Sequence, residues 1–115
     1  MAEVQTVTLT GTEYSATIVL KKESIVRIGL PAEWQTADIW IEEQSLSGGK
    51  WRPIYDKFGD RIVIPARADQ SIKVDWRVFA SYDRLRLQSS QIQTSPRNVD
   101  IVVESVNVLT AIGDV

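Results

Sequence analysis

The fold is decided by residues 37–64, which read ADIWIEEQSLSGGKWRPIYDKFGDRIVI. In residues 38–44 apolar and polar side chains alternate, which is typical of a strand with one buried face. The two faces hold Ile39 and Ile41 on one side, and Trp40, Glu42 and Gln44 on the other. Residues 47–49 (Ser-Gly-Gly) then predict a turn, because glycine reaches positive φ without a clash at Cβ.

Two further strands are predicted in the same stretch, at residues 51–55 and 61–64, joined by a turn at residues 56–60. Pro53 cannot donate a hydrogen bond to a neighbouring strand, so we expect an edge position or a bulge there. The whole stretch therefore predicts a three-stranded meander. Nothing on this meander resembles a reaction centre.

The rest of the chain continues the β pattern. Strands are predicted at residues 4–9, 15–20, 24–30, 71–75, 83–89 and 99–103. In the strand predicted at residues 24–30, Val26, Ile28 and Leu30 alternate with Ile25, Arg27 and Gly29. A single helical turn is expected within residues 76–82, and residues 65–70 and 90–98 are predicted loops. Short strands at roughly ten-residue spacing predict an all-β antiparallel sandwich or jelly roll of about eight strands.

The ends of the chain invite a separate hypothesis. We expect one domain over residues 1–115, with residues 1–10 as an edge strand or an N-terminal arm. Residues 104–115 are rich in apolar side chains, and no turn signal separates them from the strand before. They either continue that strand or form a C-terminal arm on a neighbouring subunit.

Composition excludes several classes of function. The 115 residues include 13 basic and 15 acidic side chains, for a net charge of −2, and no basic excess that would favour nucleic acid as a partner. The absence of cysteine and histidine removes thiolate nucleophiles, common metal ligands and the usual general base. The N-terminus lacks a signal peptide, and no apolar run approaches the roughly 20 residues that span a bilayer. We expect a cytoplasmic, non-enzymatic protein without a cofactor.

Some residues are candidates for binding. Asp56, Gly59 and Asp60 suggest a calcium loop, but the ligand count is too low, so an ordinary turn is preferred. The chain's four tryptophans are either core residues or exposed platforms for sugars or proteins. Trp34 and Trp76 are predicted in the core, and Trp40 in an interface. The outward arginines of residues 83–89 are either interface residues or a solvated face.

Four motifs carry a family resemblance. They are LPxxWxxADI at residues 30–39, GGxW at 48–51, IYDxxG at 54–59 and RLRLQS at 84–89. In this pattern the chain resembles, over about residues 26–103, a group of small tailed-phage virion proteins encoded near head and tail genes. It departs from them in the turn at residues 56–59, which is less acidic, and in a longer tail after Val103.

The resemblance implies a capsid cement or decoration protein on the virion surface, made in the host cytoplasm. Its partners would be the major capsid protein and copies of itself, with a homotrimer as the expected oligomer and neither nucleic acid nor membrane involved. The candidate interface residues are Trp40, Arg84, Arg86, Val106, Val108, Leu109 and Ile112. A carbohydrate-binding module of a tail fibre or baseplate, and a head–tail or tail adaptor, remain alternatives.

Overall fold

The computed structural model describes residues 2–44 and 49–105, which contain nine strands and one short 3₁₀ helix. The strands are β1 (Ala2–Gly11), β2 (Ile18–Val19), β3 (Glu23–Gly29), β4 (Ala37–Gln44), β5 (Trp51–Pro53), β6 (Val63–Ala66), β7 (Ser71–Lys73), β8 (Arg84–Ser89) and β9 (Gln93–Ser105). The helix is η1 (Trp76–Val78), within the stretch where a helical turn is predicted. None of the described residues belongs to a helix long or apolar enough to cross a lipid bilayer.

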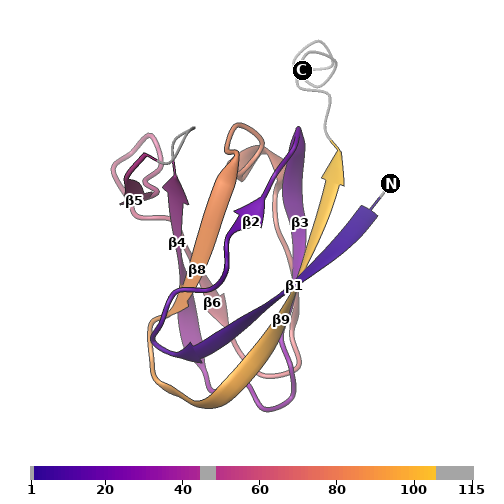
Figure 1. Ribbon diagram of the computed structural model, residues 1–115, viewed down its shortest axis with the longest axis vertical. Helices are drawn as coiled ribbons and strands as arrows, with labels where there is room; N and C mark the ends of the chain where they lie inside the picture. The colour runs from indigo at the N-terminus through magenta and orange to yellow at the C-terminus, as the bar shows by residue number, and fades with distance from the viewer. Residues whose placement is uncertain (1, 45–48, 106–115) are drawn as a thin grey trace.

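The strands form two antiparallel sheets that face one another (Figure 1). One sheet has the order β1-β9-β3-β7, and the other has the order β2-β8-β4-β5, with β6 also paired to β4. The prediction of an all-β antiparallel sandwich is therefore confirmed. The longest pairing joins β1 to β9, from Ala2 opposite Glu104 to Leu9 opposite Arg97.

The predicted meander forms around β4, but its third strand lies elsewhere than expected. One side of β4 pairs with β8, and the other side is shared by β5 and β6. β5 pairs with residues 42–44 and β6 with residues 37–40, so β6 runs beside β4 instead of outside β5. β6 also extends to Ala66 and contains Pro65, which the sequence assigned to a loop. Pro53 and Pro65 are both tolerated because β5 and β6 are edge strands.

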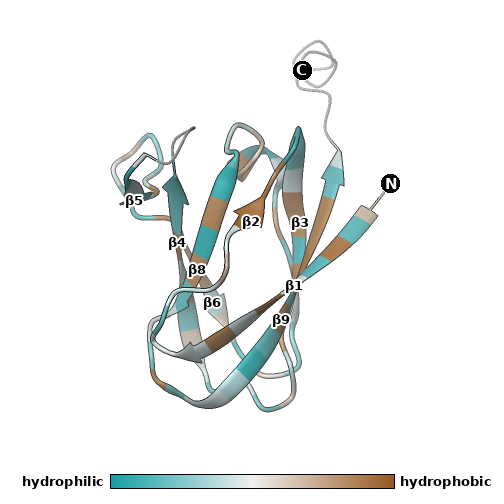
Figure 2. Ribbon diagram, in the orientation of Figure 1, coloured by the Kyte–Doolittle hydropathy of each residue, from teal (hydrophilic) through white to brown (hydrophobic). Residues whose placement is uncertain are grey.

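The core lies between the sheets and comes from the apolar half of each alternating pattern. Figure 2 shows this alternation along β8, where Leu85 and Leu87 are fully buried. Trp34 is buried as predicted, and its indole nitrogen donates to the carbonyl oxygen of Ala66 at 3.2 Å. The prediction of a core position for Trp76 is wrong, because Trp76 is only half-buried and lines a surface hollow.

A second correction concerns residues 90–98, which were predicted as a loop because they are polar. From Gln93 onward they belong to β9. The Gln93 side chain is buried, and it donates to the carbonyl oxygen of Gln35 at 2.8 Å and accepts from the Gln35 backbone N–H at 2.9 Å. An irregularity in the pairing between Leu9 and Gly11 leaves room for Pro96 in the opposite strand. The buried amide of Gln93 therefore has hydrogen-bond partners on the backbone between β3 and β4.

A third correction concerns β3. The register shifts between Ile25 and Arg27, which makes a bulge at Val26. Consequently Ile25 and Ile28, which strict alternation would put on opposite faces, are both buried, while Val26 is only half-buried. The strand predicted at residues 15–20 is also shorter than expected, since only Ile18 and Val19 pair. The turn predicted at residues 47–49 falls mostly on residues outside the described part of the chain.

Candidate interaction surface

The outer face of the β2-β8-β4-β5 sheet brings together arginine and aromatic side chains from four separate segments. Arg86 of β8 lies directly opposite Glu42 of β4. Trp51 of β5 pairs with Gln44, the next outward residue of β4. Tyr14 reaches the same place from the β1–β2 connection, which is fixed to β8 by hydrogen bonds between Ser15 and Leu87. Sequence positions 14, 42, 51 and 86 thus converge on one site.

The guanidinium of Arg86 is the centre of this arrangement. Its Nε and Nη2 atoms donate to Glu42 Oε1 at 2.8 and 2.5 Å. The same group lies 3.5 Å from the ring centroid of Tyr14 and 4.5 Å from that of Trp51. The Tyr14 hydroxyl donates to Glu42 Oε2 at 3.3 Å. One arginine therefore holds two rings and a carboxylate in fixed positions.

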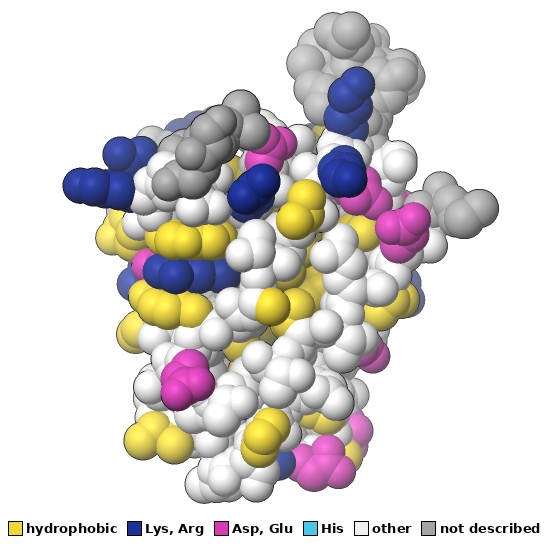
Figure 3. Space-filling view, in the orientation of Figure 1, with side chains coloured by type: hydrophobic (Ala, Val, Ile, Leu, Met, Phe, Trp, Pro, Cys, Tyr) yellow, Lys and Arg dark blue, Asp and Glu magenta, His cyan; other side chains and the backbone are white. Residues whose placement is uncertain are grey.

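The two charged side chains of this cluster, Arg86 and Glu42, are mostly buried. The side chains of Arg86 and Glu42 are only 22% and 11% exposed. At such burial an ion pair needs hydrogen bonds and close contacts to offset the loss of hydration, and the contacts to Tyr14 and Trp51 supply them. Figure 3 shows a basic side chain lying between hydrophobic ones on this side of the molecule. The result is a rigid, mostly neutral surface.

A second arginine–aromatic contact lies further along β4. The guanidinium of Arg61 is 4.8 Å from the ring centroid of Trp40. Trp40 is half-buried and lies between Gln88 of β8 and Val63 of β6. Arg61 Nε is buried without a hydrogen-bond partner in the described part of the chain. We call Tyr14, Trp40, Trp51, Arg61 and Arg86 the arginine–aromatic face.

A tight turn beside this face presents exposed aromatic residues. Asp56 Oδ1 accepts hydrogen bonds from the backbone N–H groups of Phe58 and Asp60 at 2.8 and 3.0 Å, and Gly59 adopts a φ of +89°. Phe58 at the tip is 79% exposed, and Tyr55 at the base is 55% exposed. Asp56 therefore serves the turn itself. No group of three potential acidic, cysteine or histidine ligands is found among residues 2–44 and 49–105.

The interface residues predicted from the sequence lie in different parts of the structure. Trp40 and Arg86 lie on the arginine–aromatic face, and Arg84 is an exposed neighbour opposite Gln44. Arg97 belongs to β9 of the other sheet, where it hydrogen-bonds with Gln35. Four predicted contact residues, Val106, Val108, Leu109 and Ile112, lie outside the described residues.

Tyr14, Trp51 and Phe58 were not singled out from the sequence. Tyr14 lies in an irregular connection, where no periodicity reveals which way a side chain points. Trp51 could have been placed from the hairpin register, because antiparallel pairing puts outward residues of adjacent strands side by side. Phe58 carried a weaker signal, since an aromatic residue inside a turn motif is unusual for a plain surface loop.

One titratable group has a shifted pKa. The pKa of Tyr82 is raised above its ordinary value of 10.0, first by burial and then by the negative charge of Glu43. Tyr82 lies between η1 and β8 and packs against Phe79, with a centroid distance of 6.4 Å. Tyr82 is half-buried against the core and is not part of the arginine–aromatic face, so its raised pKa bears on stability.

Neither a protein-family model, nor a curated protein, nor a solved structure matches this chain. The functional argument therefore depends on the site and on the sequence motifs. Rigid exposed rings beside a satisfied ion pair are suited to binding another molecule.

Proposed function

We propose that this protein is a non-enzymatic structural subunit of a tailed-phage particle, a capsid cement protein that attaches to major capsid subunits. The motifs at residues 30–39, 48–51, 54–59 and 84–89 support the proposal through their resemblance to small virion proteins. A sandwich is also a suitable scaffold for this role, because its sheets hold outward side chains in fixed positions.

The observation that carries the binding role is the placement of Arg86 between Tyr14 and Trp51. Tyrosine, tryptophan and arginine are the residues that most often dominate the energy of protein interfaces. Side chains that are already held lose little conformational entropy on binding, so more of the contact energy appears as affinity. The exposed ring of Phe58 supplies an anchor at the edge of the same surface.

Attachment at many equivalent sites would multiply a modest affinity. A cement protein binds several subunits at once, and linked contacts raise the effective concentration of each further contact. Self-association, with a trimer as the proposed oligomer, would add to this effect. Light scattering of the purified protein measures the oligomer directly.

The experiment uses particles that lack this protein and purified variants added back to them. The variant Tyr14→Ser/Phe58→Ser removes two exposed rings from the proposed contact surface. The matched control is Val4→Ser/Ile92→Ser, which removes two exposed apolar side chains, 60% and 68% exposed, from other parts of the molecule. We expect the first variant to bind at least about tenfold more weakly and the control to bind normally, since one or two hot-spot residues carry this much energy.

Two results would overturn the proposal. One is equal binding by both variants when thermal unfolding shows that both are folded. The other is the absence of the chain from purified particles by quantitative mass spectrometry. A copy number of only a few per particle would instead support the tail or head–tail adaptor and reject the cement role.

A carbohydrate-binding module is the second candidate, favoured by the exposed rings of Tyr55 and Phe58. Exposed aromatic rings on a β scaffold stack on sugars as well as on proteins. A glycan array with the purified protein, followed by tryptophan fluorescence titration, separates the two candidates. Saturable binding to a glycan that is lost in Phe58→Ser would favour this module over the cement protein.

A further inference from the structure

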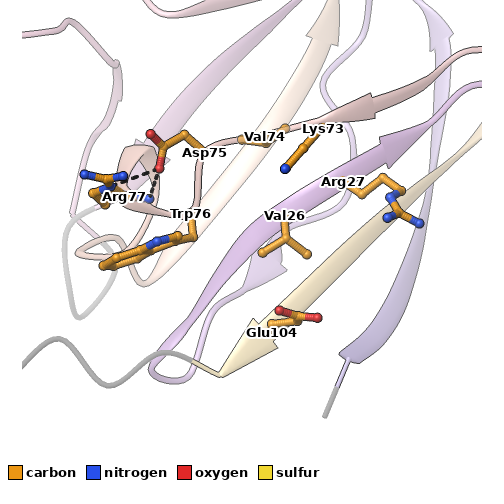
Figure 4. Close-up of a pocket in the computed structure, with 8 residues that line it drawn as sticks. All are labelled: Val26, Arg27, Lys73, Val74, Asp75, Trp76, Arg77 and Glu104. Carbon is orange, nitrogen blue, oxygen red and sulfur yellow. Dashed lines mark hydrogen bonds and ion pairs between the residues drawn. The ribbon is translucent and has the colours of Figure 1, made fainter. Parts of the chain in front are cut away.

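A hollow of about 640 Å³ opens on the other sheet, among β3, β7, η1 and the end of β9 (Figure 4). Its lining includes Val26, Arg27, Lys73, Val74, Trp76 and Glu104. Figure 4 shows Val26 in the middle, with Trp76 on one side and Arg27 on the other. None of these residues belongs to the arginine–aromatic face.

The frame of the hollow is fixed by backbone contacts. The bulge at Val26 places this side chain beside Arg27 in the hollow, and the Val26 carbonyl oxygen accepts from the Val74 backbone N–H at 3.0 Å. The Ser24 hydroxyl donates to the Trp76 carbonyl oxygen, which attaches η1 to β3. The Asp75 carboxylate accepts the backbone N–H of Arg77 at 3.0 Å and caps η1. The shape of the hollow is therefore a property of the fold.

The charges in the hollow are not balanced in the way that those around Arg86 are. Arg27 and Lys73 are directly opposite one another on β3 and β7, and like charges in this arrangement repel. Neither forms an ion pair within residues 2–44 and 49–105, where the two ion pairs are Arg86–Glu42 and Arg77–Asp75. Asp75 is thus engaged by Arg77. Glu104 also lines the hollow, so Arg27, Lys73 and Arg77 stand against Asp75 and Glu104. The remaining charge of +1 favours an anionic partner.

The middle of the hollow is apolar. Val26, Val74 and Trp76 are all half-buried and so keep part of their surface in contact with water. The Trp76 ring is held by Arg77, whose guanidinium lies 5.7 Å from the ring centroid. A partner that fits both parts carries a carboxylate next to a bulky apolar side chain.

We propose that this hollow binds an extended acidic peptide segment of a partner protein. A carboxylate of the segment lies against Arg27 and Lys73, and a neighbouring apolar side chain lies over Val26 and Trp76. A peptide fits better than a small molecule because β7 is an edge strand of three residues, paired on one side only in the described part of the chain. Such edges accept a further strand through backbone hydrogen bonds, while pockets beside them select side chains.

This site lies on the opposite sheet from the arginine–aromatic face, so it goes beyond the proposed function and does not depend on it. The test uses a fluorescein-labelled, end-capped peptide of sequence Val-Asp-Val-Asp-Val-Asp. Its control is the same peptide with asparagine in place of each aspartate. Fluorescence anisotropy gives the affinity, and ¹⁵N NMR shifts of the full chain locate the peptide.

We expect the acidic peptide to bind at least about tenfold more tightly than the asparagine peptide, with shifts centred on Val26, Lys73 and Trp76, since paired charges of this kind are worth on the order of 1.4 kcal/mol or more. Arg27→Glu/Lys73→Glu should lose this binding and should instead bind Val-Lys-Val-Lys-Val-Lys. Lys57→Glu, a charge reversal at the exposed turn, is the matched control and should bind as the unmodified chain does.

Four outcomes would overturn the proposal. Three of them are equal affinity for the two peptides, acidic-peptide shifts centred on another surface, and binding that survives in a folded Arg27→Glu/Lys73→Glu variant. Self-association through the hollow that excludes the peptide would also overturn it, since the occupant would then be a second copy of the chain. The Tyr14→Ser/Phe58→Ser variant should keep full peptide binding, so failure here is distinguishable from failure to attach to particles.

Discussion

The outer faces of the two sheets differ in how far their charged residues are buried and paired. On the β2-β8-β4-β5 sheet, Glu42 and Arg86 are mostly buried, satisfy one another and hold aromatic rings. On the β1-β9-β3-β7 sheet, exposed polar side chains form hydrogen bonds between neighbouring strands. In one of them the Thr6 hydroxyl donates to the Asp100 carboxylate at 2.8 Å. Arg27 and Lys73 stand opposite one another on that sheet without a carboxylate in an ion pair with either.

The difference shows that an outward position in a sandwich is not always a surface position. The β1–β2 connection and the β5 edge lie over Arg86 and Glu42 and convert outward residues of β8 and β4 into a small second core. Comparable residues of β3 and β7 receive no such cover in the described part of the chain. We therefore expect stability to depend on the first face and to depend little on the second.

The largest expected effect follows removal of Glu42. Glu42→Ala leaves the Arg86 guanidinium mostly buried without its carboxylate, and removing one partner of a buried pair costs about 3–5 kcal/mol. Urea denaturation followed by tryptophan fluorescence measures the free energy of unfolding. The matched control, Glu104→Ala on the other sheet, should change it by less than about 0.5 kcal/mol. Equal losses in the two variants would remove the distinction between the faces.

A medium effect is expected when Arg86 is replaced by lysine. Arg86→Lys keeps the charge but loses the planar group that contacts Glu42 through two nitrogens and both rings, so we expect a loss of about 1–2 kcal/mol. A double-mutant cycle with Trp51→Leu isolates the stacking contribution, because residues in contact give non-additive effects. If the losses of unfolding free energy that urea denaturation measures in the two single variants add up to the loss in the double variant, the stacked geometry adds nothing to stability.

The sequence was sufficient to predict the sandwich because alternation reports burial wherever one face of a strand is apolar. Leu85 and Leu87 illustrate this, since they alternate with Arg84, Arg86 and Gln88 in the sequence and both are fully buried. The prediction of a loop at residues 90–98 failed because a buried residue there has a polar side chain. Gln93 is buried, and two of its hydrogen bonds join it to the backbone of Gln35, which is 58 positions away. No local pattern encodes such a partner.

The candidate site was predicted only in part. Trp40 and Arg86 were identified as outward residues of alternating strands, and that inference needed only the period of two. Tyr14 and Trp51 meet Arg86 through tertiary packing, which depends on the path of the β1–β2 connection and on the register of β5. The bulge at Val26 was equally hidden, because a one-residue shift in register leaves no mark in a run of β-branched residues.

A smaller effect, of opposite sign, is expected on the second face. Lys73→Glu converts the repulsive pair with Arg27 into an attractive one, so stability should rise by about 0.2–1 kcal/mol at low salt. The gain should shrink as salt is added, because exposed charges are screened. Loss of stability in this variant would show that Lys73 is already neutralised and would weaken the assignment of the hollow to an acidic partner.

The smallest expected effect concerns Tyr82, which packs against the core and belongs to neither face. It appears only at alkaline pH. Tyr82 keeps its proton longer in the folded chain than in the unfolded chain, because burial and then Glu43 raise its pKa above 10.0. Its contribution to stability is therefore complete below pH 10 and is lost as the pH rises through the folded-state pKa.

Tyr82→Phe has no phenol to ionise, so its unfolding free energy should fall less steeply above pH 10 than that of the unmodified chain. Parallel urea denaturation series of the two proteins measure this difference in slope, and identical slopes would mean that Tyr82 ionises equally well in both states. Tyr55→Phe, at an exposed position beside the arginine–aromatic face, is the control.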